Sequence, residues 1–412
     1  MATPKLRFKE FDGDWTSKQL GKIIGISSAS RVFKEQWQDS GVPFFRTSDV
    51  VSIFKNKENE KAYISLELFE ELAKKSGKIK QGDLLVTGGG SIGIPYLVPN
   101  DQPLYFKDAD LLWMKSSGIV EGSFLYNFFI SPKFREYLKS ISHTGTISHF
   151  TIEQAKATPF GFPSKEEQTK IASFLSAVDE KISQLTEKHA LLSQYKQGMM
   201  QKLFSQQLRF KADDGSEFGE WEDSKLGELT TLITKGTTPS SLGEKYEESG
   251  INFIKIESLS SNGKFLLDKF AYIDENTHNK LARSKLEHDD ILFSIAGALG
   301  RVAIISRDYL PANTNQALAI IRLKDKKITR YIYYFLNSDY VKKIIDAESV
   351  QLAQANFSLG QLANLDVLVP CLEEQTKIAN FLSAIDQKIE VVAQQIEQAK
   401  QWKKGLLQQM FV

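Results

Sequence analysis

A glycine-rich segment is the part of this sequence that most resembles a small-ligand site. Residues 88–93 read Gly-Gly-Gly-Ser-Ile-Gly, which fits the G-x-G-x-x-G pattern of dinucleotide-binding loops, and Asp110 follows about 20 residues later, as that pattern asks. The pattern also requires a helix directly after the loop, but Pro95 follows here within sequence typical of a second strand. The similar segment 295–300 lacks the first glycine. We therefore predict a tight hairpin at 88–93, with nucleotide binding as the weaker alternative.

Other signatures of catalysis and of metal binding are missing from the sequence. The chain has neither the Asn/Asp-Pro-Pro-aromatic tetrapeptide of adenine methyltransferases nor a phosphate loop ending in Gly-Lys-Ser/Thr. It has one cysteine, Cys371, and five scattered histidines, which do not make a zinc-binding pattern. His143 and His149 stand six residues apart, a spacing more typical of ordinary loop histidines than of ligands. We expect no catalytic residue, no metal and no cofactor bound by this chain.

The composition indicates a cytoplasmic globular protein. The chain has 412 residues, of which 42% are hydrophobic and 25% charged, enough for two or three domains with ordinary cores. A single cysteine excludes an internal disulfide framework, and the N-terminus lacks the apolar core of a signal peptide. The longest apolar run, 291–300, is far shorter than the roughly 20 residues that span a bilayer. The net charge of +1 argues against a protein coated in positive charge but leaves room for a local basic face that binds DNA.

Two proline-free segments, 165–206 and 372–412, predict the long helices that would position the other elements. Their apolar residues recur with a period of 3.5, which is typical of a coiled-coil seam. The predicted seam residues of the first helix are Ile171, Leu175, Val178, Ile182, Leu185, Leu192 and Met199. Those of the second helix are Ile378, Leu382, Ile385, Ile389, Val392, Ile396 and Leu406.

The two helices are natural partners for one another, and we predict that they pair as an antiparallel coiled coil. The alternative is two independent surface helices. Lys196 and Lys403 fall in the two seams, where each could fix the register or extend into solvent. Ser164 is the predicted N-cap of the first helix, with Glu167 reaching back to close a capping box. Cys371 takes the N-cap place of the second helix, so its cap is weaker.

The chain is an internal duplication. Segments 163–182 and 370–389 match at 15 of 20 positions without a gap, at an offset of 207 residues. The segment Leu-Arg-Phe-Lys occurs at 6–9 and again at 208–211. By contrast, segments 82–98 and 289–305 match at only 4 of 17 positions, although their hydrophobic pattern is the same. The copies thus share a frame and differ in surface chemistry, which suits two different readers of a bipartite, non-palindromic target.

The fold class expected from these patterns is α+β. Each copy begins with a mixed part, in which β-rich runs (42–50, 83–86, 251–256, 291–294 and 317–323) alternate with helical stretches (65–75, 124–141 and 329–347). We predict two mixed α/β domains, 1–164 and 207–371, related by pseudo-two-fold symmetry. The helices 165–206 and 372–412 would join them.

The arrangement resembles the specificity subunits of Type I restriction–modification systems. The resemblance covers essentially the whole chain and is carried by the opening LRFKEFDGDWTSKQLGKI, the segment GVPFFRTSDV, the loop TKGTTPSS and the twice-repeated P-x-x-EEQTKIA-x-FLSA. It implies a non-catalytic subunit that binds double-stranded DNA through two target-recognition domains. It also implies two modification (adenine methyltransferase) subunits, docked on the paired helices, and restriction subunits for cleavage. S-adenosylmethionine, ATP and Mg²⁺ would be bound by those partners.

Candidate DNA-binding residues are basic or polar side chains near glycine turns, because base edges and phosphates are contacted by such groups. In the first copy they are Arg31, Lys34, Arg46, Thr47, Ser48, Ser91, Thr146, Ser148 and His149. In the second copy they are Lys235, Thr237, Thr238, Lys255, Arg301, Asn313, Gln316, Gln351 and Asn356. Two other functions stay open at this point. A self-sufficient nucleic-acid enzyme would need a catalytic motif, and a scaffold for partner proteins would leave the two divergent β-rich parts unexplained.

Overall fold

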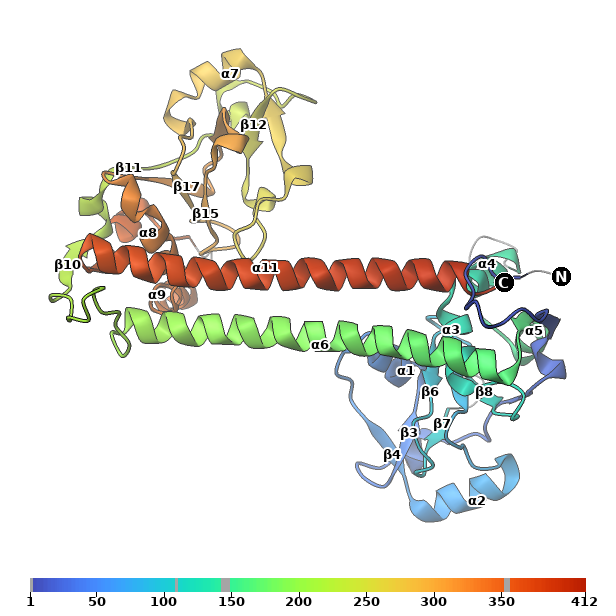
Figure 1. The fold of residues 1–412 in the computed structure, drawn as a ribbon. Helices are drawn as coiled ribbons and strands as arrows, with labels where there is room; N and C mark the ends of the chain where they lie inside the picture. The colour runs from blue at the N-terminus through green and yellow to red at the C-terminus, as the bar shows by residue number, and fades with distance from the viewer. Residues whose placement is uncertain (1–2, 108–109, 142–148, 352–355) are drawn as a thin grey trace. The chain divides into compact units, whose positions relative to one another are not determined.

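The computed structural model describes residues 3–107, 110–141, 149–351 and 356–412, and the chain separates into two compact units (Figure 1). The first unit consists of Met1–Glu187 and Ala393–Val412, and the second of Lys188–Val392. Each unit therefore contains one mixed α/β domain together with parts of both long helices.

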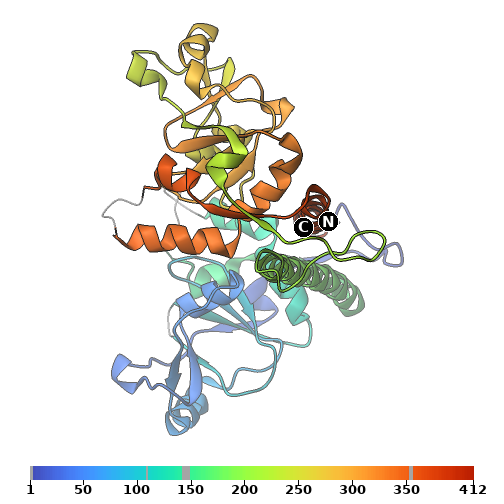
Figure 2. The same cartoon turned by 90° about the vertical axis from the view of Figure 1, so that its left-hand side faces the viewer.

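The two long helices, α6 (Lys165–Phe204) and α11 (Leu372–Gln409), lie side by side (Figures 1 and 2). In the first unit, the beginning of α6 packs with the end of α11. In the second unit, the end of α6 packs with the beginning of α11. The pairing is therefore antiparallel, as predicted, and the alternative of two independent surface helices is wrong.

The predicted seam residues lie on the less exposed face of each helix. Ile171, Leu175 and Val178 are buried on α6, as Ile378, Leu382 and Ile385 are on α11. The remaining predicted seam positions are buried or half-buried: Ile182, Leu185, Leu192, Met199, Ile389, Val392, Ile396 and Leu406. This burial agrees with a seam, and the assignment of the individual seam positions stays a prediction.

Both seam lysines form an ion pair with the opposite helix rather than extending into solvent. Lys403 Nζ lies 2.5 Å from Asp179 Oδ1 in the first unit. Lys196 Nζ lies 2.6 Å from Asp386 Oδ1 in the second unit, and Tyr334 Oη donates a hydrogen bond to the same carboxylate. The same Lys–Asp contact is made once in each unit, which specifies one register for the pairing.

The domain of the first unit is built from short strands and helices. Its sheets have the orders β2-β8-β5-β6, β4-β3-β7 and β1-β9. These strands are β1 Thr16–Gln19, β2 Gly25–Ser27, β3 Val42–Phe45, β4 Ala62–Ile64, β5 Leu84–Thr87, β6 Pro95–Leu97, β7 Tyr105–Phe106, β8 Leu111–Lys115 and β9 Pro159–Phe162. Its helices are α1 Thr47–Phe54, α2 Leu66–Ser76, α3 Gly122–Ile130, α4 Pro132–Ser140 and α5 Ile152–Ala157.

The domain of the second unit repeats this topology. Its sheets have the corresponding orders β11-β17-β14-β15, β13-β12-β16 and β10-β18. These strands are β10 Glu222–Lys225, β11 Thr230–Lys235, β12 Ile251–Ile254, β13 Ala271–Ile273, β14 Ile291–Ser294, β15 Val302–Ile304, β16 Ala312–Thr314, β17 Leu318–Leu323 and β18 Asp366–Val369. Its helices are α7 Glu275–Lys280, α8 Thr329–Leu336, α9 Asp339–Gln351 and α10 Leu359–Ala363. The predicted duplication and mixed fold class are confirmed, whereas the division at 1–164, 165–206, 207–371 and 372–412 stays a prediction.

Three sequence-based expectations about local structure need correction. The predicted β-rich run 42–50 ends at Phe45 and is followed by α1, because the Asp49 carboxylate accepts a hydrogen bond from the backbone N–H of Arg46 at 2.8 Å and so stabilises the start of a helix. The predicted helix 124–141 is two helices, since Ser131 caps α4 and Pro132 occupies its first turn. The predicted helix 329–347 is likewise interrupted between α8 and α9.

A buried Arg–Trp–Glu clamp, formed once in each unit, explains the most strongly repeated residues. In the first unit, Arg7 donates two hydrogen bonds of 2.7 Å to the Glu167 carboxylate, and Trp15 Nε1 donates a third at 3.3 Å. Ser164 Oγ does cap α6, accepting from the backbone N–H of Glu167 at 3.4 Å. The expected return of the Glu167 side chain to the cap is wrong, because its carboxylate, only 1% exposed, is held by Arg7 and Trp15.

In the second unit the same clamp consists of Arg209, Trp221 and Glu374. Arg209 donates to the Glu374 carboxylate at 3.1 and 2.8 Å, and Trp221 Nε1 donates at 3.0 Å. The clamp attaches the start of a long helix to the segment that leads into its neighbouring domain. The repeated Leu-Arg-Phe-Lys and Glu-Glu-Gln-Thr segments are thus two parts of one structural element.

The end of the chain belongs to the core of the first unit. Met410 and Phe411 are buried there, and the Phe411 ring lies 5.1 Å from that of Phe124. The backbone N–H of Leu6 donates to the carbonyl of Gln409 at 3.0 Å. The first domain therefore completes its core with residues from the other end of the chain. Within the described ranges, no helix is both long enough and apolar enough to cross a membrane.

Candidate nucleic-acid interface

The glycine-rich segment forms a β-hairpin, as predicted. Strands β5 and β6 pair antiparallel on either side of it, so a strand and not a helix follows the loop. Thr87 closes the loop, since its hydroxyl donates to the carbonyl of Ser91 and accepts from the N–H of Ile94. Gly93 has a φ of +70°, and a Cβ there would lie 2.8 Å from the ring of Phe134. The nucleotide-binding alternative is therefore wrong, and Ser91 is presented at an exposed tip.

The second unit has the corresponding hairpin, formed by β14 and β15. Ser294 occupies the position equivalent to Thr87, and its hydroxyl donates to the carbonyl of Ala298 at 2.6 Å. Each hairpin loop pairs with a segment that follows it in sequence, through the bridges Gly89–His149 and Ala296–Asn356. His149 and Asn356 are both exposed. The equivalence of these two residues, expected from the duplication, is confirmed.

A polar groove of about 410 Å³ in the second unit brings together several of the predicted residues. We call it the Thr237 groove, and it is lined by Lys235, Gly236, Thr237, Thr238, Ser240, Ser241, Arg283 and Gln316. Thr238 donates a hydrogen bond to Gln316, and Arg283 Nη2 donates to Thr237 Oγ1 at 3.0 Å. Gly236 is required there, because a Cβ would lie 2.0 Å from the carbonyl oxygen of Thr314. The groove offers donors and acceptors on one exposed surface, as base or phosphate contacts require.

Arg283 was missed at the sequence level. It follows α7 in a short 3-10 turn, Ala282–Ser284, and is distant in sequence from the Lys235–Thr238 segment that it meets. Its only signal in the sequence is an isolated basic residue without a glycine turn beside it, so it could not be distinguished from a surface arginine.

In the first unit, Arg31 and Lys34 are exposed. The Arg31 guanidinium lies 5.3 Å from the centre of the Phe33 ring, which is itself exposed. Arg31 follows β2, just as the Thr237 segment follows β11 in the second unit. These two basic side chains are therefore placed where the second copy has its polar groove.

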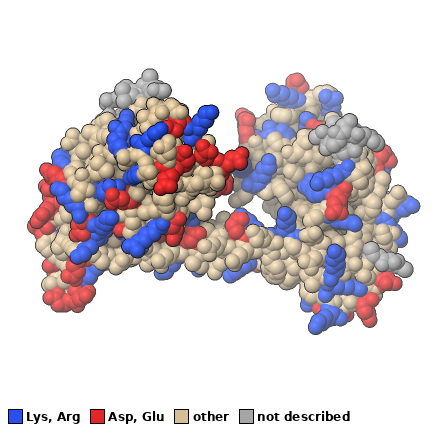
Figure 3. Space-filling model, turned by 90° about the horizontal axis from the view of Figure 1, so that it is seen from above, with Lys and Arg blue, Asp and Glu red and all other residues tan. Residues whose placement is uncertain are grey.

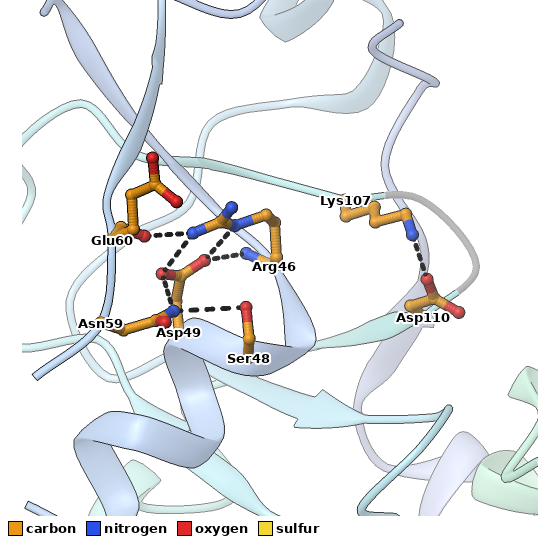
Figure 4. Close-up of polar contacts among 7 residues, drawn as sticks. All are labelled: Arg46, Ser48, Asp49, Asn59, Glu60, Lys107 and Asp110. Atoms are coloured by element: carbon orange, nitrogen blue, oxygen red, sulfur yellow. Dashed lines mark hydrogen bonds and ion pairs between the residues drawn. The ribbon is translucent and has the colours of Figure 1, made fainter. Parts of the chain in front are cut away.

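Arg46 is engaged within the protein (Figure 4). Its guanidinium donates to both carboxylate oxygens of Asp49, at 2.8 and 3.2 Å, and to the backbone carbonyl of Glu60. The hydrogen bonds from Arg46 to Asp49 raise the pKa of the arginine above its usual value. Ser48 is exposed and accepts from Asn59 at 3.2 Å, while the Thr47 hydroxyl donates to the carbonyl of Asp110 at 3.4 Å. Of these three predicted residues, Ser48 is the most accessible.

We expect Arg46→Lys to lower the free energy of unfolding by about 1–2 kcal/mol, because lysine cannot form the two-pronged bond to buried Asp49. Chemical denaturation measures this loss. The salt dependence of DNA affinity should stay unchanged, since the positive charge is kept and Arg46 is used internally. A variant with normal stability but weakened, salt-sensitive DNA binding would show instead that Arg46 contacts DNA.

Other predicted residues are placed differently from the expectation. Asn313 is a correction: it is fully buried, and its amide donates to the carbonyl of Leu281 and to Ser284, so it belongs to the core. Arg301 donates to the backbone carbonyls of Ile256 and Leu259. Lys255 precedes a short turn, where its backbone N–H donates to Ser258 Oγ at 3.1 Å, and its Nζ lies 5.6 Å from the Tyr246 ring.

Three predicted residues cannot be placed on the interface. Thr146 and Ser148 lie outside the described residues. Gln351 ends α9, and its side chain is likewise outside the described part of the chain. All three stay predictions.

The charge distribution agrees with an interface that is local. On the face drawn in Figure 3, cationic and anionic side chains are intermingled on each unit and form no continuous basic field. Within the described ranges, no group of three or more His, Cys, Asp or Glu side chains could hold a metal ion. DNA binding by this chain would therefore depend on particular loops and grooves.

These features define a class of protein: a duplicated α/β fold with paired long helices and exposed polar loops that differ between the copies. The family model of the Type I restriction modification DNA specificity domain matches residues 12–193 and again residues 219–401, so the chain belongs to this family. It is a protein of the specificity-subunit class, whose members are non-catalytic.

Relatives and solved structures agree with this assignment. The Type I restriction enzyme MjaVIII specificity subunit of Methanocaldococcus jannaschii is 28% identical over 69% of this chain and 68% of its own length. The putative MjaX specificity subunit of the same organism is 25% identical over 98% of this chain and 94% of its own length. The crystal structure of a Type I S subunit from M. genitalium shares the fold, with a TM-score of 0.58 at 18% identity over 100% of this chain and 99% of that chain. A structure described as showing complex assembly of the type I R-M system has a TM-score of 0.59 at 17% identity, covering 96% of this chain and 97% of that one.

Proposed function

We propose that this chain reads a bipartite, asymmetric DNA target for a Type I restriction–modification complex, one half of the target with each unit. The observation that carries the proposal is a contrast between the copies. The Arg–Trp–Glu clamp and the Lys–Asp contact are kept in both units. The exposed loops at equivalent places carry different residues, such as His149 and Asn356 beside the two hairpins. A shared frame with different readers recognises two different half-sites.

The proposed DNA-reading residues are the predicted ones that are at least half-accessible and are not engaged within the protein as Arg46, Lys255 and Arg301 are. In the first unit they are Arg31, Lys34, Thr47, Ser48, Ser91 and His149. In the second unit they are Lys235, Thr237, Thr238, Gln316 and Asn356, to which we add Arg283. Such side chains can donate to or accept from base edges and phosphates.

The paired helices supply the proposed docking surface for two modification subunits. Tyr195 on α6 and Trp402 on α11 stand at repeat-related positions and are 51% and 54% exposed. Large exposed aromatic side chains are typical of protein interfaces. The presence of two equivalent aromatic sites supports the proposal that one modification subunit docks at each site. Restriction subunits would join this assembly, and S-adenosylmethionine, ATP and Mg²⁺ would be bound by the partner subunits.

The proposal is tested by the target that the complex selects. The chain, assembled with its modification subunits, should enrich a bipartite motif from a pool of random duplexes. Replacing residues 15–163 with the same region of another specificity subunit should change one half of the motif and leave the other half and the spacing unchanged. The matched control is replacement of residues 221–370, which should change only the opposite half.

Two outcomes would contradict the proposal. Exchange of one domain that altered both halves equally would mean that the units do not read separately. Enrichment of no motif, with the modification subunits present and bound, would favour a scaffold that joins proteins through its helices.

A further inference from the structure

A basic groove of about 540 Å³ lies in the first unit between α4 and the last turns of α11. Its charged lining residues are Arg135, Glu136, Lys139, Lys400, Lys403 and Lys404. Lys400, Lys403 and Lys404 fall on one face of α11, because residues three and four apart are neighbours on a helix. Five cations therefore face one carboxylate around a single depression.

Only part of this positive charge is neutralised within the protein. Lys403 pairs with Asp179 and Lys400 pairs with Glu397. Lys139 and Lys404 have no acidic partner among the residues that the structure describes, and both are exposed.

Arg135 is half-buried without a carboxylate partner among the described residues. Its Nη1 donates to the backbone carbonyl of Ile92 at 3.0 Å, and burial lowers the pKa of its guanidinium. An anion bound in the groove would compensate for this loss of hydration.

The groove is linked to the hairpin proposed to read DNA through Arg135, which lines the groove and donates to the hairpin loop. Ile92, the acceptor for Arg135, belongs to the loop that presents Ser91. On the other side of that loop, Gly93 approaches Phe134 and Leu138 of α4 so closely that a Cβ would lie 2.8 Å from either side chain. A phosphate bound in the groove would thus lie close to the segment of DNA that the hairpin is proposed to contact.

Comparison with the second unit shows that the fold does not require this charge. At an offset of 207 residues, Lys139, Lys400 and Lys404 correspond to Asp346, Ser193 and Gln197. The seam lysine is shared, as Lys403 in one unit and Lys196 in the other, and Arg135 and Glu136 correspond to Lys342 and Lys343. Lys139, Lys400 and Lys404 are therefore particular to the first unit, although both units have the same scaffold.

We propose that the α4–α11 groove binds backbone phosphates of duplex DNA next to the half-site read by the first unit, independently of base sequence. Flexible lysine side chains suit phosphate as point charges, and phosphate contacts position a protein on DNA without specifying sequence. The inference rests on the proposed function, since it assigns a second and non-specific part to the same DNA interface.

The test compares Lys139→Gln/Lys404→Gln with the matched control Lys18→Gln/Lys22→Gln, which removes two exposed lysines of the same unit that neither line the groove nor lie on the long helices. The full chain with its modification subunits is titrated at several salt concentrations against a duplex with the selected motif and one without it. We expect the groove variant to lower the slope of log affinity against log salt by about 1.8, at ~0.9 per phosphate contact. Affinity for both duplexes should fall by the same factor, with the motif preference kept, and the control should behave like the parent.

A slope equal to that of the parent would overturn the inference. If the groove variant instead weakened association with the modification subunits and left the slope unchanged, the groove would bind an acidic protein surface. If the parent itself showed no motif preference but the groove variant still lowered the slope, the proposed function would fail and the phosphate site would stand.

Discussion

Gly236→Ala is expected to abolish recognition of one half of the DNA target while the other half is still selected. A Cβ at this position would lie 2.0 Å from the carbonyl oxygen of Thr314 and 2.4 Å from that of Asn315. Backbone atoms cannot give way as a flexible side chain can, so Lys235–Thr238 must move away from Gln316 and the Thr237 groove must change shape. Loss of one or two base contacts, at ~1–3 kcal/mol each, corresponds to about a 100-fold lower affinity for the selected motif.

The measurement is motif enrichment and direct binding by the chain with its modification subunits. Gly219→Ala is the matched control, because nothing lies within 4 Å of the Cβ it would add. Arg283→Gln is a second variant that guards against misfolding, since Arg283 is exposed and lines the groove without being part of the core. Enrichment of both half-sites by Gly236→Ala and Arg283→Gln would show that the Thr237 groove does not read DNA.

Arg209→Ala should be among the most destabilising single substitutions in the chain. It leaves the Glu374 carboxylate, which is fully buried, with only Trp221 as a hydrogen-bond donor among the described side chains. Removing one partner of a buried ion pair costs roughly 3–5 kcal/mol, because the remaining charge is desolvated without compensation. Denaturant unfolding should show this loss as an earlier transition.

A double variant separates the effect of the unpaired Glu374 charge from the effect of losing the packing of the Arg209 side chain. Arg209→Met/Glu374→Gln removes both charges and keeps an acceptor for Trp221, so it should recover much of the stability. Arg7→Ala should have a similar effect through Glu167, since the clamp is the same. Arg307→Ala, at an exposed position, is the control and should change stability little. A double variant as unstable as Arg209→Ala would mean that packing of the arginine, and not the unpaired charge, dominates.

Features that depend on periodicity or on repetition could be predicted from the sequence. The heptads predicted two long helices that pair, and Ile171 and Ile378 are buried, because a contact face repeats along a helix whatever it packs against. Pro95, together with the missing first glycine of segment 295–300, distinguished a hairpin from a nucleotide-binding loop. The duplication correctly paired His149 with Asn356.

Features that depend on contacts between distant residues could not be predicted. Whether a polar side chain reads DNA or supports the core is decided by its neighbours in space. Asn313 is buried against Ser284, and Arg46 is held by Asp49 and Glu60, although each looked like a free polar residue in a β-rich segment. Glu167 has the spacing of a capping residue, but its carboxylate accepts hydrogen bonds from Arg7, which lies 160 residues away in the sequence. Arg283 was overlooked because it looked like an ordinary surface arginine in the sequence, although it meets Thr237 in the folded chain.

The burial of Met410 and Phe411 in the first domain has a consequence for biosynthesis. A ribosome releases the N-terminal domain long before it makes those two residues, and until then the rings of Phe124 and Phe128 lack part of their apolar cover. The nascent domain cannot complete this part of its core until residues 410 and 411 have been translated. A premature stop that removed these two residues would therefore damage the half of the protein that was translated first.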